Sequence, residues 1–380
     1  MKILYIINRI ADLAGIERIL SCKMNYLAEN TDILIYLTTY EQNNAELSFQ
    51  LCPSIKYCPI NSPTPKKNKS TFFEWLKMYI QSRMLFKKQF NKLLSEIHPD
   101  IVISTIYSYE VIDIITYAAR QIQAKAIIES HIKGDTVSMA KYMSNYILHK
   151  AFLQWDNHLK NSLKKCECIV ALTNADANYW RDYNKNVKVI PNMLTIVPQR
   201  VKNYHKKRVI AAGRYAHQKG FDMLLKAWHI LNSKFGDWHL YIFGNGYRGT
   251  FQEMVDKLGL NNSVYLMPAT TNIAEEFSNS SIYVMSSRFE GFPLVLGEAM
   301  SCGLPCVSFD CPYGPREIIT NGEDGIIVEN GNIKELAYQL GRLMSDYEMR
   351  KAMGEKAIMN ISRYKPESIM KQWIDLFQNI

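Results

Sequence analysis

Glu290 and Glu298 are the residues whose types and spacing point most directly to ligand chemistry. Seven residues separate them, and Gly291 and Pro293 favour a tight turn between a predicted strand and the helix that follows. This turn places Glu290 in the loop and Glu298 on the helix, so both can face the crevice at the carboxyl edge of an open parallel sheet. Paired carboxylates accept hydrogen bonds from vicinal hydroxyls, which sugars and ribose present. Helix capping or solvation would explain either acid alone, but explains the pair poorly.

Arg214 and Lys219 form a second cluster, on a predicted strand-to-helix loop that also contains Gly213. Two cations beside a helix N-terminus are suited to binding a diphosphate. Surface basicity is the alternative interpretation. A cation at that end of a helix opposes the helix dipole, however, and an anionic ligand would relieve the conflict.

A glycine-rich turn, GNGYRG at 244–249, has the G-x-G-x-x-G spacing of dinucleotide-binding loops. It follows the second predicted strand of its half rather than the first, and the next strand ends without the acid that binds the ribose of NAD. We therefore expect Gly244 and Gly246 to lie near a nucleotide, but not to bind NAD.

The elements that must position these residues follow an α/β pattern along the 380 residues. Short β-branched runs without polar alternation, typical of parallel strands covered on both faces, alternate with longer amphipathic stretches. Strands are predicted at 2–7, 33–38, 101–105, 124–129, 168–173 and 187–190, and then at 208–212, 239–243, 264–267, 282–286, 305–309 and 325–328. We predict two domains, at 1–192 and 208–365, a linker at 193–207, and a final helix at 366–380.

The segment EGFPLVLGEAMSCGLP, which contains both glutamates, resembles the signature of the retaining glycosyltransferases of family four. The similarity covers the second half nearly throughout and the first half loosely, and includes GR at 213–214, QKG at 218–220, CVSFDCPYGPREII at 306–319, TNAD at 173–176 and VIPN at 189–192. It implies the GT-B fold: two Rossmann-like parallel-sheet domains facing a central cleft, the first on the acceptor side and the second binding the nucleotide sugar. The C-terminal helix would return to the N-terminal domain.

The resemblance also implies a role for each matching residue of the second half. Arg214 and Lys219, beside Gly213, would hold the nucleotide diphosphate and stabilise it as the leaving group. Glu290 would bind hydroxyls of the donor sugar, and Glu298 would bind those of the ribose. The backbone at the helix N-terminus would contact sugar and phosphate at Phe292, Pro293, Leu294 and Val295.

In the first half, His131 matches the family's active-site histidine near the donor sugar. The loop after the first strand departs from the family, which usually has two adjacent glycines there. Gly15 is retained, but Ala14 replaces the other glycine. A Cβ at position 14 weakens the expected close approach of this backbone to the donor phosphate or acceptor.

Mechanistically, the resemblance implies transfer with retention of the anomeric configuration. Departure of the nucleoside diphosphate would generate an oxocarbenium-like centre, attacked by an acceptor hydroxyl from the same face. Arg214 and Lys219 are suited to stabilising charge on the leaving phosphate. The chain has no Asp-x-Asp sequence, so neither a divalent metal nor another cofactor is expected.

Charge is distributed unevenly along the chain. Residues 1–208 hold 29 Lys and Arg against 17 Asp and Glu, a net of +12, and the remainder holds 16 against 19, a net of −3. The segment 65–92 contains eight basic residues, one acid and many aromatics, which is typical of a helix that lies on an anionic membrane. A surface helix with a solvated basic face is the alternative. No nucleic-acid recognition motif accompanies the charge, so a nucleic-acid partner is not expected.

The remaining patterns bear on location. We find no signal peptide and no apolar run of 18 residues, and the eight cysteines have no zinc-site spacing. The expectation is a cytoplasmic protein, peripheral on the inner face of the cytoplasmic membrane.

Together these features predict an enzyme that moves a hexose or N-acetylhexosamine from a nucleotide sugar, foremost a UDP-sugar, to a hydroxyl of a glycan or lipid-linked acceptor in cell-surface polysaccharide assembly. Two alternatives stay open. One is a nucleotide-sugar epimerase of the same architecture, and the other is a non-catalytic glycan- or nucleotide-binding protein.

Overall fold

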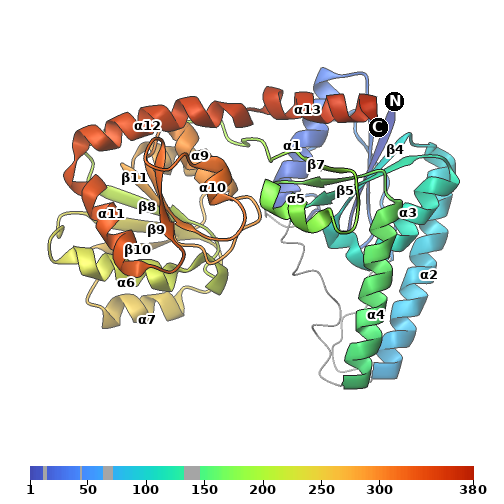
Figure 1. The fold of residues 1–380 in the computed structure, drawn as a ribbon, viewed down its shortest axis with the longest axis horizontal. Coiled ribbons are helices and arrows are strands. Elements are labelled where there is room, and N and C mark those ends of the chain that lie inside the picture. Colours follow the sequence, from blue (N-terminus) through green and yellow to red (C-terminus); the bar gives the residue numbers. More distant parts are fainter. Residues whose placement is uncertain (12–14, 43–44, 63–71, 132–145) are drawn as a thin grey trace. The chain divides into compact units, whose positions relative to one another are not determined.

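A computed structural model describes residues 1–11, 15–42, 45–62, 72–131 and 146–380. They form two compact units, Met1–Met193 together with Pro366–Ile380, and Leu194–Lys365. Each unit is a parallel sheet covered by helices (Figure 1). The two Rossmann-like sheets confirm the predicted α/β fold, and the return of the last helix to the first unit is also confirmed.

The first unit is built on a seven-stranded parallel sheet in the order β3-β2-β1-β4-β5-β6-β7. Its strands are β1 (Lys2–Ile7), β2 (Leu34–Thr39), β3 (Lys56–Tyr57), β4 (Ile101–Thr105), β5 (Lys125–Ser130), β6 (Cys168–Ala171) and β7 (Val187–Val189). Every residue of β4 and β6 is buried, as expected for apolar runs covered on both faces. The two-residue β3 was not predicted, because it carries no apolar run.

Helices of the first unit cover this sheet and its edges. They are α1 (Gly15–Asn30), α2 (Phe72–Ile97), α3 (Ile112–Gln121), α4 (Tyr146–Ser162), α5 (Asn174–Trp180) and α13 (Pro366–Asn379), with the short 3-10 helix η1 (Ile106–Val111) before α3. The last helix, α13, contacts α1. It buries four side chains in the first unit: Ile369, Met370, Trp373 and Phe377.

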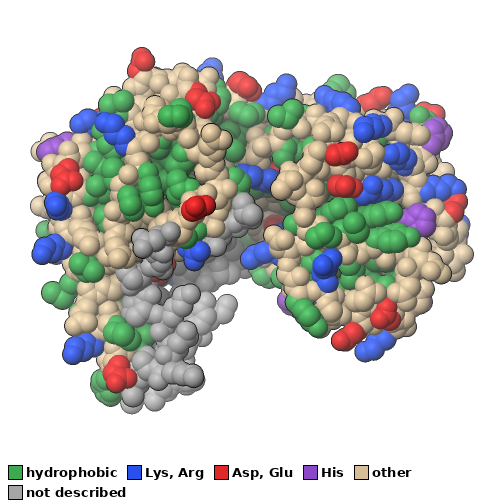
Figure 2. All heavy atoms as spheres, turned by 180° about the vertical axis from the view of Figure 1, so that it is seen from behind, with side chains coloured by type: hydrophobic (Ala, Val, Ile, Leu, Met, Phe, Trp, Pro, Cys, Tyr) green, Lys and Arg blue, Asp and Glu red, His purple; other side chains and the backbone are tan. Residues whose placement is uncertain are grey.

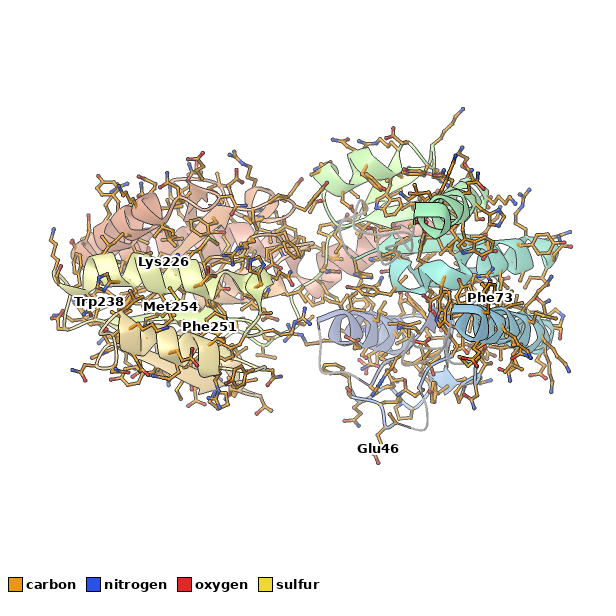
Figure 3. The ribbon with its side chains drawn as sticks, turned by 90° about the horizontal axis from the view of Figure 1, so that it is seen from below. Glu46, Phe73, Lys226, Trp238, Phe251 and Met254 are labelled. Atoms are coloured by element: carbon orange, nitrogen blue, oxygen red, sulfur yellow. The ribbon has the colours of Figure 1, made fainter. Side chains whose placement is uncertain are left out.

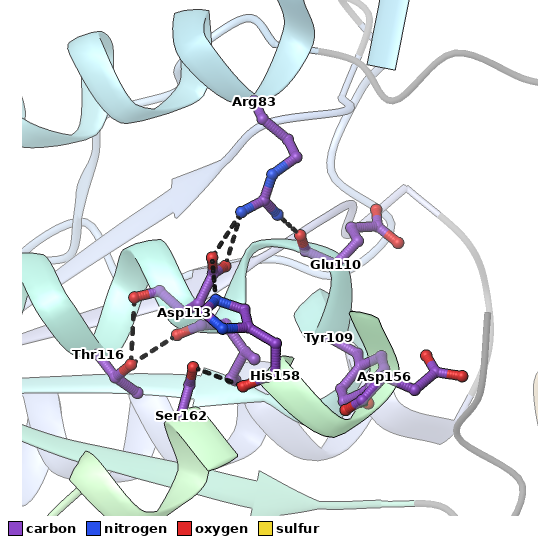
Figure 4. A network of polar contacts seen from close by, with 9 residues as sticks. Arg83, Tyr109, Glu110, Asp113, Thr116, Asp156, His158 and Ser162 are labelled. Carbon is purple, nitrogen blue, oxygen red and sulfur yellow. Dashed lines mark hydrogen bonds and ion pairs between the residues drawn. The ribbon is translucent and has the colours of Figure 1, made fainter. Parts of the chain in front are cut away.

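A polar network fastens α2 to α3 and α4 (Figure 4). Arg83 on α2 donates hydrogen bonds to both carboxylate oxygens of Asp113 on α3, at 2.9 and 2.6 Å, and another to the carbonyl of Glu110. On α4, Nε2 of His158 lies 3.6 Å from the same carboxylate. These contacts hold Arg83 of α2 against α3, and its guanidinium also lies 5.0 Å from the ring of Trp155 on α4.

The second unit has a six-stranded parallel sheet in the order β10-β9-β8-β11-β12-β13. Its strands are β8 (Arg208–Ala212), β9 (His239–Gly244), β10 (Val264–Pro268), β11 (Ile282–Met285), β12 (Cys306–Asp310) and β13 (Gly325–Glu329). Its helices are α6 (Phe221–Asn232), α7 (Gly249–Lys257), α8 (Ile273–Ser278), α9 (Leu294–Cys302), α10 (Pro315–Ile318), α11 (Ile333–Ser345) and α12 (Tyr347–Ile361). Phe251 and Met254 lie between α6 and α7 (Figure 3) and pack on the buried core.

The structure corrects the predicted linker at 193–207, because 194–207 belong to the second unit. The amide of Leu194 donates to the carbonyl of Tyr364 at 2.9 Å, and that of Val201 donates to the carbonyl of Cys302 at 2.9 Å. The prolines and missing periodicity signalled irregular backbone, but irregular backbone can still pack when its polar groups find partners.

None of the described helices combines the length and the apolar character needed to cross a lipid bilayer.

Candidate functional site

The candidate site lies where the order of the second sheet reverses, between β8 and β11. From β8 the chain continues to β9 on one side of this point, and from β11 it continues to β12 on the other side. The loops that follow β8 and β11 therefore diverge. That point at the carboxyl edge is where open α/β sheets bind ligands. One loop carries Arg214 and Lys219 and the other carries Glu290, so two of the predicted clusters meet there.

Lys219 and Glu290 form an ion pair in the site. Nζ of Lys219 lies 2.7 Å from Oε1 of Glu290, and the two side chains are 19% and 7% exposed. The hydroxyl of Ser287, a residue that was not predicted, donates to the same oxygen at 2.5 Å. No described residue donates to Oε2 of Glu290, so this oxygen can accept a hydrogen bond from a ligand hydroxyl.

Close backbone contacts join the two loops. Gly220 has a φ of +62°, and a Cβ added there would lie 2.0 Å from the carbonyl oxygen of Ser286. The Ser286 hydroxyl donates to the carbonyl of Lys219 at 2.9 Å. Only glycine combines this backbone conformation with so close an approach.

A second ion pair supports the loop after β11. Arg288 donates to the two carboxylate oxygens of Asp222 at 2.8 and 2.7 Å, and to the carbonyl of His217 at 2.7 Å. Hydrogen bonding from Arg288 lowers the pKa of Asp222, and Asp222 raises the pKa of Arg288. The pair ties this loop to the first turn of α6. Sequence reasoning missed it, because 66 residues separate the partners.

Arg214 and Glu298 differ sharply in exposure. Arg214 is exposed and makes no ion pair with the described residues, so its charge is available to a ligand. Glu298 is only 1% exposed, and its Oε1 accepts a hydrogen bond from the hydroxyl of Thr195 at 2.9 Å. The role expected for Glu298 with ribose therefore requires the surroundings of this carboxylate to open.

Gly244 and Gly246 have a structural reason to be glycine. A Cβ on Gly244 would lie 1.8 Å from the carbonyl oxygen of Gly213, and one on Gly246, whose φ is +112°, would lie 3.3 Å from that of Tyr215. The turn after β9 thus packs directly on the loop that carries Arg214. Packing alone accounts for both glycines, whether or not a nucleotide lies nearby.

The N-terminus of α9 lies in the loop that carries Glu290. Pro293 caps the helix, and the first residues are Leu294 and Val295. Their backbone N–H groups have no acceptor within the helix and form its positive end. The ring of Phe292 packs edge-on against Tyr364, with centroids 5.6 Å apart. The backbone expected to contact sugar and phosphate therefore lies in the same loop as Glu290.

In the first unit, His131 follows β5 and is buried. Its Nε2 lies 3.0 Å from Oε2 of Glu129, whose Oε1 lies 2.7 Å from Nζ of Lys23. Burial raises the pKa of Glu129, but Lys23 and His131 outweigh burial and hold it at about 2. Neither Lys23 nor Glu129 was predicted, although an acid in an apolar strand was a usable signal. Gly15 is exposed and begins α1, while Ala14 lies outside the described residues.

Within the part of the chain that the structure describes, no group of three or more His, Cys, Asp or Glu side chains could hold a metal ion.

Residues 194–359, nearly the whole second unit, match the family described as "Glycosyl transferases group 1". An uncharacterized glycosyltransferase of Haemophilus influenzae is 33% identical over 235 residues, which are 59% of this chain and 67% of the relative. The amylovoran biosynthesis glycosyltransferase AmsD of Erwinia amylovora is 26% identical over 387 residues, covering 99% of each chain.

The fold is also found among solved structures. HepE of Anabaena, in a crystal structure with UDP, matches this structure with a TM-score of 0.75 at 15% identity, over 100% of both chains.

Proposed function

Because the chain belongs to the group 1 glycosyltransferases and has the GT-B fold, we propose that it moves a hexose or N-acetylhexosamine from a UDP-sugar, with retention of configuration. The acceptor would be a hydroxyl of a glycan or lipid-linked glycan in bacterial cell-surface polysaccharide assembly. AmsD acts in amylovoran biosynthesis, which supports an acceptor in polysaccharide assembly. HepE was solved with UDP, which supports a UDP-sugar as the donor.

The observation that carries the proposal is the pair of Lys219 and Glu290 at the switch point, with Arg214 exposed on the same loop. Oε1 of Glu290 is occupied by Lys219 and Ser287, which fixes the carboxylate. Oε2 would then accept a hydrogen bond from a hydroxyl of the donor sugar. Lys219 and Arg214 would face the diphosphate, whose negative charge grows as the bond to the anomeric carbon breaks.

The roles of these groups follow from where charge develops. Departure of the diphosphate leaves positive charge on the sugar and negative charge on the phosphate. The cations and the N-terminus of α9 stabilise the phosphate, and we propose that they do so without a divalent metal. Glu290, neutralised in part by Lys219, orients the sugar. The acceptor oxygen bonds to the anomeric carbon from the face that the diphosphate leaves, and the hydroxyl proton passes to the departing diphosphate.

A panel of UDP-, GDP- and dTDP-sugars tests the proposal first by thermal stabilisation, since a ligand that binds only the folded state raises the Tm. Transfer is then followed by NMR of the anomeric proton, with and without EDTA. Lys219→Ala should lower kcat at least 100-fold. Lys226→Ala, on the same unit and outside the site, is the control. Wild-type kcat in Lys219→Ala would remove the proposal, and an inverted product or loss of activity with EDTA would correct its mechanism.

The dependence of turnover on an acceptor distinguishes a glycosyltransferase from the two alternatives, an epimerase and a binding protein. An epimerase converts the nucleotide sugar without an acceptor, whereas a glycosyltransferase releases UDP at a rate that depends on it. A binding protein retains thermal stabilisation by the ligand but shows no turnover with any acceptor.

We also propose that the first unit binds an anionic membrane through the outward face of α2. Trp75, Tyr79, Phe86 and Phe90 of this helix are buried in the core. The opposite face carries the stripe Phe73, Lys77, Ile80, Met84, Lys87 and Lys88, all of them exposed. In Figure 2, Lys, Arg and hydrophobic side chains occur together along the edge of the first unit where α2 runs. Lys66, Lys67 and Lys69 lie outside the described residues.

Flotation with vesicles of phosphatidylglycerol and phosphatidylcholine tests this surface. Each lysine near such a surface contributes about 1 kcal/mol, so Lys87→Gln with Lys88→Gln should weaken binding about 30-fold. The control is Lys351→Gln with Lys356→Gln, which removes two exposed charges of α12. Equal binding by the two double variants would remove the membrane proposal.

The apolar part of the stripe is tested with two methionines of similar exposure. Met84 is 68% exposed on α2 and Met359 is 63% exposed on α12. Met84→Ser should weaken vesicle binding several-fold, because this side chain would be buried in the interface, and Met359→Ser should not. A purely electrostatic contact would leave both variants binding like wild type.

A further inference from the structure

Lys23, Glu129 and His131 form a continuous buried line of polar contacts in the first unit. Lys23 Nζ and Glu129 Oε1 lie 2.7 Å apart, with side chains 3% and 1% exposed. Glu129 Oε2 and His131 Nε2 lie 3.0 Å apart, and both side chains are 1% exposed. The ring of Trp373 on α13 covers Lys23, with its centroid 3.5 Å from Nζ. Three separate parts of the chain, α1, the end of β5 and α13, therefore build this line.

The pair of Lys23 and Glu129 is ionised and has no net charge. Burial lowers the pKa of Lys23 and Glu129 raises it, while Lys23 and His131 hold the pKa of Glu129 at about 2 against the effect of burial. Tyr5 lies close by and stays neutral, since burial and then Glu129 raise its pKa well above 10. Along this line, Glu129 of β5 lies beside both His131 and Lys23 of α1. The rings of Tyr5 on β1 and of the neutral Trp373 on α13 lie 5.9 and 3.5 Å from Nζ of Lys23.

The carboxylate of Glu129 determines where His131 carries its proton. A carboxylate only accepts hydrogen bonds, so the proton lies on Nε2. Nδ1 is buried and has no hydrogen-bond partner among the described residues. A proton on Nδ1 as well would leave a net positive charge beside Lys23 in the interior, which is unfavourable.

We propose that Lys23 and Glu129 are positioning residues that keep His131 neutral with its proton on Nε2, so that Nδ1, once the surroundings of the ring open to a substrate, offers it a lone pair for a hydroxyl. Lys23 acts by cancelling the charge of Glu129. Without Lys23, the carboxylate would favour the imidazolium form, whose Nδ1 donates a hydrogen bond instead of accepting one. The identity of the hydroxyl as part of a sugar rests on the proposed function, whereas the tautomer does not.

The tautomer is read directly by 15N NMR of the full chain labelled at histidine, with the His131 signals assigned by their loss in His131→Asn. We expect the Nε2–H form in wild type between pH 7 and 8. In Lys23→Met, which keeps an unbranched side chain beside Trp373, the titration midpoint of His131 should rise by about one pH unit, a tenfold gain in proton affinity. Adding Glu129→Gln to Lys23→Met should return the midpoint to the wild-type value. Tyr5→Phe, which changes no charge, should leave it unmoved.

The acid limb of the pH–activity profile should follow the same midpoints. A merely structural role for the pair would lower activity equally at all pH values. An Nδ1–H tautomer in wild type, or an unshifted midpoint in a folded Lys23→Met, overturns the proposal. If Lys23→Met fails to fold, Lys23→Arg is measured instead. Because this variant retains the positive charge, the titration midpoint of His131 must stay at the wild-type value, and a shifted midpoint would overturn the proposal. If no sugar is transferred at all, the NMR result still stands and only the proposed function fails.

Discussion

Gly220 allows a sharp test of how the site is assembled, because Gly259 provides a matched control. Both have a left-handed backbone, with φ of +62° and +66°. A Cβ on Gly220 would lie 2.0 Å from the carbonyl oxygen of Ser286, whereas one on Gly259 would meet no atom within 4 Å. The two Gly→Ala variants therefore share the backbone strain and differ only in the clash.

The magnitudes follow from that difference. The left-handed conformation costs an alanine about 1–2 kcal/mol, and the lower entropy of the unfolded chain offsets about 0.4–1 kcal/mol. Gly259→Ala should thus lose about 1 kcal/mol of unfolding free energy. In Gly220→Ala the clash must move Ser286 by roughly 1 Å, and overpacking adds about 1–3 kcal/mol, which gives about 2–4 kcal/mol in total.

The clash should also lower the rate of the transfer reaction. Ser287 and Glu290 follow Ser286 on the same loop, and their hydrogen bond of 2.5 Å would not survive such a shift. A misplacement of about 1 Å can lower kcat about 100-fold. Urea unfolding and the transfer assay measure both effects. Equal stability losses in Gly220→Ala and Gly259→Ala, with full activity in both, would refute the claim that this contact positions Glu290.

Two further predictions concern ion pairs. Arg288→Lys should lose about 1 kcal/mol in urea unfolding, because an ammonium cannot donate both parallel bonds to Asp222, and an unchanged midpoint would show that the pair contributes nothing. The pKa of Glu129, 4.5 when unperturbed and about 2 in the folded state, is depressed, so its stabilising contribution is present above pH 4.5 and is lost as the pH falls toward 2. Denaturant titrations across this range should show the loss in wild type but not in Glu129→Gln, and parallel curves would contradict the assignment.

Most of the fold could be predicted from the sequence, because parallel strands buried on both faces leave apolar runs that are visible without a structure. The strands β1, β4 and β8 have the predicted bounds. The packing of residues 194–207 on the second unit could not be predicted, because backbone hydrogen bonds such as that of Val201 to Cys302 leave no mark on composition. Within α2, Phe73 and Trp75 are both aromatic, and only tertiary packing separates the exposed side chain of Phe73 from the buried one of Trp75.

The residue types of the candidate site could be predicted from the sequence, but the ion pairs between its residues could not. Arg214, Lys219 and Glu290 lie on the two loops at the switch point, as the strand order requires. That Lys219 binds Glu290 across 71 residues, or Lys23 binds Glu129 across 106, depends on three-dimensional proximity that local pattern does not encode. Both pairs are partly or fully buried, so removing one partner would leave the other without the contact that compensates its burial.

The position of α13 has a consequence for the order in which the protein matures. Synthesis proceeds toward the C-terminus, so all of Leu194–Lys365 leaves the ribosome before Pro366–Ile380. The second unit can therefore fold as soon as it emerges, while the first waits with the surface beneath Trp373 and Phe377 uncovered. Until α13 arrives, Lys23 lacks the ring that covers it, and the line to His131 is incomplete. A nascent chain thus completes its second unit early and its histidine-bearing first unit last.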